Sequence, residues 1–428
     1  MNSYIYKVLF FVVSLIATQG QNTPPRCQRN FVRRDVRSLS SAEWNRMVST
    51  ISSMNQNGWF AWFSRIHTIN ANAIHNWAQF LPFHRRFIIE FENVARRYQS
   101  DFAIPYWDSA RDFDNPAGSV VMSGSYLGGN GGPGRCVRNG IQANMIMSYP
   151  TRHCLQRAFN GGSGINPWQS PELVSSLIQT SVDYNSFRTG LEYGIHASVH
   201  NGIGGDMATM NSPNDFAFFL HHSNIDRIWW GWQNARQNNL MGYGGRNIDG
   251  SAASLNDNIS VYGDRVGSLL RLGNGRVCYS YSGQSTLAKR QNSQGNGDSA
   301  DSGLLRYLSS DYVKQYFPLL PSKNIDRSAI GLPVYGRPVS TAGMGRNGTI
   351  ANGASASSGR GQSVNQNGSK QMNRPNNGRG RRIRYPALVS EKWLRMNNYD
   401  VNYYRRFYSR ERSIVDMLNR SGYVSPYL

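Results

Sequence analysis

The chain has 428 residues, of which 39% are hydrophobic and 17% charged, and its formal net charge is +21. Beyond the N-terminus no apolar run reaches the roughly 20 residues that cross a bilayer, which argues against a membrane protein. The cysteines are too sparse for a disulfide scaffold but form an even set, compatible with two bridges in an oxidising compartment and with their pairing open: Cys27, Cys136, Cys154 and Cys278.

The first twenty residues have the pattern of a secretory signal. Lys7 precedes an apolar run over residues 8–16, and small or polar residues follow. We therefore expect residues 1–20 to be a signal peptide and the mature protein to be secreted. Acceptor sequons agree with secretion and mark four candidate glycosylation sites: Asn258, Asn347, Asn367 and Asn419.

Three histidines follow in one aromatic-rich stretch: His67, His75 and His84. Residues 82–98 are expected to form a helix with Pro82 near its first turn, where a proline is tolerated. The residues at helical spacing from His84 are apolar, namely Phe87, Ile88, Phe91 and Ala95. His84 should therefore point inward.

A second stretch places Glu192, His196 and His200 at intervals of four residues. On a helix these side chains share one face and would form a metal-binding ridge, although Glu192 could also be an ordinary solvated residue.

A further helix is expected to begin within residues 212–215, where a Ser or Asn cap precedes an acid near the positive helix end. One stripe of this helix holds Phe218, His222, Asp226 and Trp229. His221 also has apolar residues at helical spacing, so periodicity alone does not choose between His221 and His222. Neutral imidazole is a preferred nitrogen ligand of copper, zinc and iron, and three per ion leave positions open for a substrate. Two sets of three histidines predict two metal ions side by side.

The stretch GGDMATMNSPNDFAFFLHHSNIDRIW resembles the second copper motif of the type 3 copper proteins, namely tyrosinases, catechol oxidases and molluscan haemocyanin units. In that family the ligand lies four residues before the Asp that corresponds to Asp226, which selects His222. The resemblance assigns His67, His75 and His84 to the first copper site and His196 and His200 to the second. Residues 105–108 (PYWD) and the pair Tyr279 and Tyr281 resemble further landmarks, so the match covers residues 27–283.

The resemblance implies a mainly α fold, with a four-helix-bundle core around a dinuclear copper site and long loops, over a domain of residues 21–285. It implies oxidation of o-diphenols to o-quinones by dioxygen, with copper carrying the redox chemistry. Phe218 is expected to wall the pocket, and His221 and Asp226 to support the ligands.

Departures from the family pattern bear on the substrate. Many monophenol-hydroxylating tyrosinases carry Asn where this chain has Ala197, and that Asn helps a Glu, here Glu192, to hold a catalytic water. We therefore expect catechol oxidation to be favoured over monophenol hydroxylation, with Glu192 as the catalytic residue that remains. Ala73 replaces a Cys that forms a thioether in many relatives, so no thioether is expected at His75. Phe216 replaces a Pro at the helix start.

The rest of the chain changes character. We expect residues 286–335 to be a partly ordered linker, with a short packed helix at LLRYLSSDYVKQYFPLL. Residues 336–428 form a basic Gly/Ser/Asn/Arg-rich region that is expected to be largely disordered, with a last stretch from Ile383 that folds weakly or only on a partner. From Arg337 onward sixteen Lys or Arg stand against four Asp or Glu, a balance of +12. Such a tail favours acidic matrix macromolecules or mineral over nucleic acid in a secreted protein, unless it only confers solubility.

Signal, single copper domain and basic tail together resemble the tyrosinase-like proteins of mollusc shell matrix. This narrower resemblance implies o-quinones that crosslink or pigment an extracellular matrix, with small phenols or protein tyrosine and dopa side chains as substrates. Two alternatives stay open: an oxygen carrier of haemocyanin type, and a matrix protein that keeps the fold without catalysis. In several latent relatives the C-terminal region covers the copper site, but this sequence identifies no blocking residue.

Overall fold

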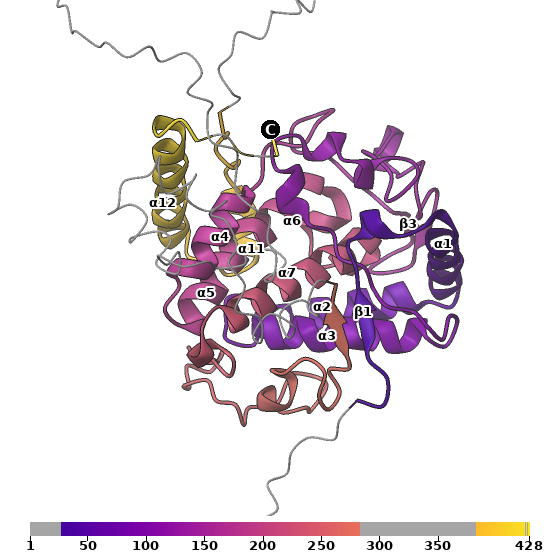
Figure 1. Ribbon diagram of the computed structural model, residues 1–428. Helices are drawn as coiled ribbons and strands as arrows, with labels where there is room; N and C mark the ends of the chain where they lie inside the picture. Colours follow the sequence, from indigo (N-terminus) through magenta and orange to yellow (C-terminus); the bar gives the residue numbers. More distant parts are fainter. Residues whose placement is uncertain (1–26, 283–381, 424, 426) are drawn as a thin grey trace, which may run out of the picture.

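The computed structural model describes residues 27–282 and 382–428, apart from Val424 and Pro426, and shows a mainly helical molecule (Figure 1). The helical fold class expected from the sequence is confirmed. The expected signal peptide, the linker 286–335 with its short helix, and the sequons at Asn347 and Asn367 lie outside the described residues. Within the described ranges, no helix is long and apolar enough to cross a membrane.

The α-helices of these ranges are α1 (Ser41–Gln56), α2 (Trp59–Ile74), α3 (Phe80–Ala95), α4 (Pro171–Thr180), α5 (Tyr184–Leu191), α6 (Ala197–Ile203), α7 (Phe216–Ala235), α11 (Glu391–Met396) and α12 (Val401–Arg420). Short strands pair in two places. β1 (Phe31–Arg33) runs parallel to β4 (Tyr279–Tyr281), and β2 (Ile146–Met147) runs antiparallel to β3 (His153–Cys154).

Aromatic rings hold α2, α3 and α7 together. Phe91 of α3 stacks on Phe219 of α7 with ring centroids 3.7 Å apart, and Phe63 of α2 contacts both rings at 5.3 and 5.7 Å. Burying a ring of this size stabilises the fold by about 2–3 kcal/mol. Since His67 lies four residues after Phe63 and His222 three residues after Phe219, the same packing fixes the positions of these histidines.

Two disulfides close the loops around this core. Cys27 bonds to Cys278 beside the β1–β4 pair, and Cys136 bonds to Cys154 on β3. The two bridges expected from the even cysteine count are confirmed, and the structure supplies the pairing that the sequence left open.

A buried ionic network joins the β1–β4 pair to α3 and α7. Asp226 of α7 accepts hydrogen bonds from Arg85 and Arg33 and from the hydroxyls of Tyr279 and Tyr281. Burial alone would raise the pKa of Asp226, but the two guanidinium groups hold it below its usual range. The family landmark Tyr279 and Tyr281 therefore anchors the last strand of the copper domain to the helix that carries His222.

The start of α7 differs from the expected one. Ser212–Asn214 form a separate 3-10 turn, and α7 begins at Phe216 with Asp215 as its N-cap. The Asp215 carboxylate accepts from the amide of Ala217 and is clamped by the buried guanidinium of Arg157 at 2.7 and 2.8 Å. The amide of Phe216 donates to Gln142 at 2.6 Å, a bond that the usual proline at this position could not form.

The regular helix expected across Glu192 and the two following histidines is interrupted. Residues Glu192–His196 form a π turn between α5 and α6, and Gly194 within it has a non-helical backbone with φ −85° and ψ −114°. Such turns occur mostly as local insertions in α-helices, often at functional sites. His196 and His200 still share one side of the chain, whereas the Glu192 carboxylate has other partners.

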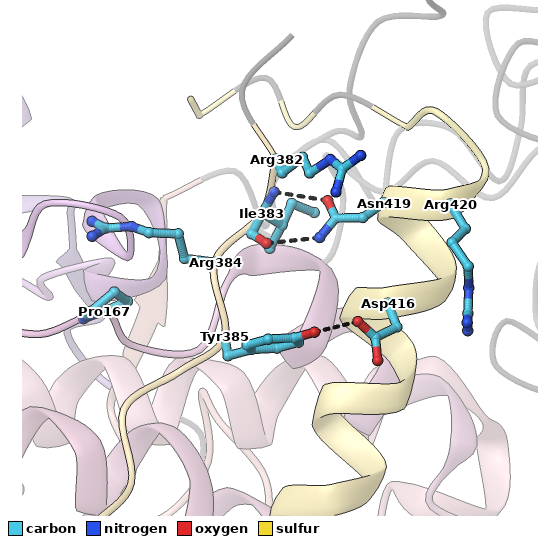
Figure 2. Close-up of a pocket in the computed structure, with 8 residues that line it drawn as sticks. All are labelled: Pro167, Arg382, Ile383, Arg384, Tyr385, Asp416, Asn419 and Arg420. Atoms are coloured by element: carbon cyan, nitrogen blue, oxygen red, sulfur yellow. Dashed lines mark hydrogen bonds between the residues drawn. The ribbon is translucent and has the colours of Figure 1, made fainter. Parts of the chain in front are cut away.

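The C-terminal segment of residues 382–423, here called the cap, packs on the copper domain. Figure 1 shows α12 beside α4 and α5, and α11 contacts α12. At the far end of the cap, the side-chain amide of Asn419 pairs with both main-chain groups of Ile383 at 2.9 Å, and Tyr385 donates to Asp416 (Figure 2). The last stretch was expected to fold weakly or only on a partner. Instead it folds against its own chain, because its apolar positions repeat at helical spacing.

Candidate metal centre

The six predicted histidines gather into two buried clusters. His67, His75 and His84 form the first, and His196, His200 and His222 the second, with the ligand atoms of each cluster within 4.8 Å of one another. All six side chains are at most 4% exposed. The sequence prediction that these residues come together in two threes is confirmed.

The two clusters lie side by side. The ring of His84 from the first stacks on the ring of His222 from the second, with centroids 4.2 Å apart and planes 12° apart. His75 and His196 approach at 6.0 Å. Two ions held by these clusters would therefore lie next to each other, with the stacked rings of His84 and His222 at the boundary between the two sites.

Backbone carbonyls orient most of the rings. The Nδ1 atoms of five histidines lie 2.6–3.2 Å from carbonyl oxygens, and these pairs are His67 with Met210, His75 with Ala71, His84 with Phe80, His196 with Glu192 and His200 with Met207. With Nδ1 donating, the lone pair of each ring is on Nε2. Such an outer hydrogen bond is the usual partner of a metal-bound imidazole because it fixes the tautomer and the ring orientation.

The Nε2 atoms face one another without a shared hydrogen-bond donor. Nε2 of His67 lies 3.5 Å from Nε2 of His84, and Nε2 of His200 lies 3.3 Å from Nε2 of His222. Nε2 of His196 is buried, and none of the described residues forms a hydrogen bond with it. Converging lone pairs in a dry interior are costly unless a cation lies between them, so the donor set fits a metal ion in each cluster.

Burial keeps the imidazoles neutral. It lowers the pKa of His67 and of His200 to about 4, and it lowers the pKa of the other four well below the usual value. A metal ligand must be the unprotonated form, so no proton has to be displaced at neutral pH. Six neutral imidazoles in two threes are consistent with a dinuclear type 3 copper site.

Aromatic rings enclose the histidines. Phe218 lies one turn before His222 with its ring centroid 4.1 Å away, and it also contacts His67 at 5.2 Å. His221 is fully buried and stacks on His196 at 5.8 Å, outside the two clusters. Asp226 makes its contacts in the ionic network with Arg33 and Arg85, away from these rings.

Glu192 is fully buried and its carboxylate is held by three donors. Oε1 accepts from the amide of Asn76 at 2.6 Å and from the hydroxyl of Tyr399 at 2.8 Å, and Oε2 accepts from Arg188 at 2.7 Å. Burial raises the pKa of Glu192 although Arg188 opposes the shift. Glu192 is therefore not a solvated residue. Its hydrogen bond with the amide of Asn76 connects the carboxylate to the residue that follows the ligand His75.

The cap closes over the second cluster. The ring of Trp393 lies 6.2 Å from those of His196 and His200. Tyr399 stacks on Tyr193 at 4.2 Å. A separate apolar cluster forms here from two copper-domain residues and five cap residues: Tyr193, Ala197, Val389, Trp393, Leu394, Tyr399 and Tyr404. Ala197, the departure from the Asn of many relatives, thus lies at the base of the cap.

Sequence reasoning missed the residues that the cap brings to the site. Trp393 lies about 195 positions after the two histidines that it contacts, and Tyr399 lies 207 positions after Glu192, so no local spacing links them. One signal was available: Tyr404, Glu411, Ile414, Val415 and Leu418 recur at helical spacing and are the buried residues of α12. That pattern predicts an amphipathic helix with one buried face, but it does not indicate which part of the protein this face packs against.

Comparisons with known proteins find similarity to tyrosinases. Residues 44–235 match the common central domain of tyrosinase. A tyrosinase of Aspergillus flavus is 29% identical over 304 residues, which are 63% of this chain and 85% of that protein. A tyrosinase of Streptomyces antibioticus is 31% identical over 267 residues, 56% of this chain and 95% of that protein. Among solved structures, a polyphenol oxidase variant from Thermothelomyces thermophila aligns with a TM-score of 0.48 and 22% identity, over 60% of this chain and 90% of that one. The chain therefore belongs to the tyrosinase family, as an oxidoreductase with both copper-binding histidine triads present.

Proposed function

We propose that this protein is a secreted phenol oxidase in which the six histidines hold two copper ions and o-diphenols are oxidised to o-quinones. The observation that carries the proposal is the pair of buried, neutral histidine triads that share the His84–His222 stack. Two catechols and one dioxygen give two o-quinones and two waters, so electrons and protons balance. Bound copper would supply the transfer of electrons from the catechol to dioxygen.

The chain's own residues supply geometry and exclusion of water. Backbone carbonyls at Nδ1 hold five of the six imidazoles in place, and Phe218 with Phe80 provides an apolar wall against which a phenol ring could lie. We assign this chemistry to a catalytic domain of residues 21–285, followed by the linker 286–335 and the basic region 336–428.

Diphenol oxidation is the favoured reaction. Hydroxylation of a monophenol needs a base that removes the phenol proton, and Glu192 is the candidate. Its carboxylate is already engaged by Arg188, Asn76 and Tyr399, and Ala197 has no polar group with which to hold a water beside it. An oxygen carrier of haemocyanin type would use the same histidines, and turnover of catechol separates it from an enzyme.

The described conformation is the closed form of the enzyme. Trp393 lies against two histidines of the second cluster, where an aromatic substrate would have to approach, and the cap encloses Tyr399 and Ala197 beside it. We propose that the protein is latent until the cap moves or is removed, as in the latent relatives that the sequence resembles.

Two disulfides and an N-terminal signal pattern support secretion. The basic C-terminal region supports a location in an acidic extracellular matrix, such as that of a mollusc shell, where o-quinones would crosslink or pigment proteins. A matrix protein without catalysis is the alternative, and one experiment separates the two. The purified protein is assayed for copper and for catechol turnover, before and after limited proteolysis of the cap. Two copper ions per chain with turnover support the enzyme, and full copper without turnover in either form supports the structural role.

A further inference from the structure

One acidic side chain of the cap is buried against the copper domain, with no cationic partner in the part of the chain that the structure describes. Glu411, on the inner face of α12, is 7% exposed. Its carboxylate accepts one hydrogen bond, from the side-chain amide of Gln169 at 3.1 Å. No Lys or Arg among the residues that the structure describes forms an ion pair with it. Burial therefore raises the pKa of Glu411 to about 8.

The position of Glu411 couples it to the metal centre. Glu411 and Phe407 lie over Gly194, in the π turn that carries His196: a Cβ placed on Gly194 would be 3.2 Å from Phe407 and 3.7 Å from the Glu411 carboxylate. A side chain at this position would therefore be in close contact with Phe407, and the glycine lets α12 pack directly on the π turn. Tyr399, which donates a hydrogen bond to Glu192, lies two residues before α12 begins at Val401. A movement of α12 that exposes Glu411 to water should therefore also displace Tyr399.

The groups around Glu411 give an ionised carboxylate no compensation. On α12 itself Tyr404 and Tyr408 face it, and Gln169 approaches from the segment before α4. On α4 the nearest titratable group is Glu172, whose carboxylate accepts from Tyr423. On the π turn these groups are Glu192, which is paired with Arg188, and His196, which is neutral because burial lowers its pKa. An anion at Glu411 would thus lie among hydroxyls, an amide and other acids.

We propose that Glu411 is a pH-sensitive switch of the cap: the protonated carboxyl permits docking over the copper site, and its ionisation drives the cap into solution. This proposal rests on the proposed function in one respect: the site that the cap covers is taken to be catalytic. In the released cap the Glu411 carboxyl has the ordinary pKa of a solvated glutamate, whereas in the docked cap its pKa is about 8. Between these two pKa values the docked form binds one more proton than the released form. In that window docking weakens as pH rises, by up to about tenfold per pH unit. Above the window no further change is expected.

The test compares the full-length protein with Glu411→Gln, which keeps the shape of the protonated side chain but cannot ionise. Hydrogen exchange of the α11 and α12 amides is measured at pH 5.5, 6.5 and 7.5 and corrected for intrinsic rates. The opening constant of the cap should rise at least tenfold over this range in the parent and stay constant in Glu411→Gln and in a second neutral variant, Glu411→Met. The matched control is Glu391→Gln, an exposed cap acid paired with Arg405, which should behave as the parent does.

A pH-independent cap in the parent, or the same pH dependence in Glu411→Gln, would overturn the proposal. Catechol turnover is followed in parallel, and the ratio of parent to Glu411→Gln should increase with pH. Because exchange reports the cap without catalysis, a protein that shows the exchange change but no turnover refutes the proposed function and leaves the switch standing.

Discussion

The stacked pair His84 and His222, with ring planes 12° apart, joins the two histidine clusters across the α3–α7 contact. Each residue belongs to a different cluster, yet both rings lie within one aromatic layer that includes Phe218. The spacing of the two clusters is therefore set by helix packing rather than by a loop, and a change in either histidine should affect binding of one ion first.

Replacing His222 with Ala should lower the copper content from two ions to about one per chain, because the first cluster keeps all three of its imidazoles. Catechol oxidation should be lost, since it needs both ions. Metal analysis of the purified protein measures the first effect and oxygen uptake the second. His153→Ala is the control, because His153 pairs with Asp206 outside both clusters. Two bound ions in the His222 variant would show that the ligand assignment is wrong.

Asp226→Asn should destabilise the fold strongly. The change leaves the guanidinium groups of Arg33 and Arg85 buried with less negative charge, and removing one partner from a buried ion pair costs about 3–5 kcal/mol. Thermal unfolding of the copper-free protein measures the loss. Asp249→Asn, on an exposed turn, is the matched control. A melting temperature close to that of the parent would mean that the network contributes little to stability.

Ala197→Asn should raise the rate of tyrosine oxidation relative to that of dopa, because the amide could help Glu192 to hold a water. The structure adds a second effect: an amide at this position is buried in the apolar cluster with Trp393 and Tyr399, and an unsatisfied amide there costs about 1–3 kcal/mol. The cap should also open more easily in this variant. Steady-state rates with both substrates test the ratio, and exchange at α11 tests the cap. Unchanged rates for both substrates would show that Ala197 does not determine the preference for diphenols over monophenols.

The parts of the site that could be predicted are those with local spacing. Periodicity indicates that His84 points inward and that His196 and His200 share one face. The family motif assigns His67 and His75, and it separates His222 from His221 where periodicity does not. The partners of Asp226 could not be predicted, because Arg33 is 193 positions away and reaches it only through the β1–β4 pairing. The start of α7 was misplaced for a related reason: Asp215 is fixed as the cap by Arg157, 58 positions earlier. Docking of the cap depends on apolar faces whose pairing no spacing encodes.

Glycosylation should distinguish the two sequons that the structure describes, if the protein is secreted. Asn258 is exposed, and only its backbone carbonyl forms a hydrogen bond among the described residues, with Gln79. The amide of Asn419 is covered by the main chain of Ile383, so a glycan there would compete with the packed cap. Glycopeptide mass analysis of the secreted protein should find sugar at Asn258 and none at Asn419. Full occupancy of Asn419 in a protein with a protected α12 would contradict this.

The outer face of α12 should bind acidic polymers. It exposes several arginines, of which Arg406, Arg412 and Arg420 make no ion pair in the described residues, and Arg420 borders the hollow shown in Figure 2 together with Arg382 and Arg384. Binding to a sulfated polysaccharide should weaken steeply with salt, because screening limits exposed charges to about 8 Å at physiological ionic strength. Replacing Arg406, Arg412 and Arg420 of α12 with Ser should remove most of the binding without changing the copper content.

The matched control removes the same charge from the copper domain, through Ser at the exposed residues Arg65, Arg152 and Arg271. Column retention on the polysaccharide at rising salt compares the two triple variants with the parent. If the position of the charge matters, the α12 variant elutes much earlier and the control close to the parent. Equal retention of the two variants would show that only the net charge of +21 acts, and the cap would then have no specific role in holding the enzyme in an acidic matrix.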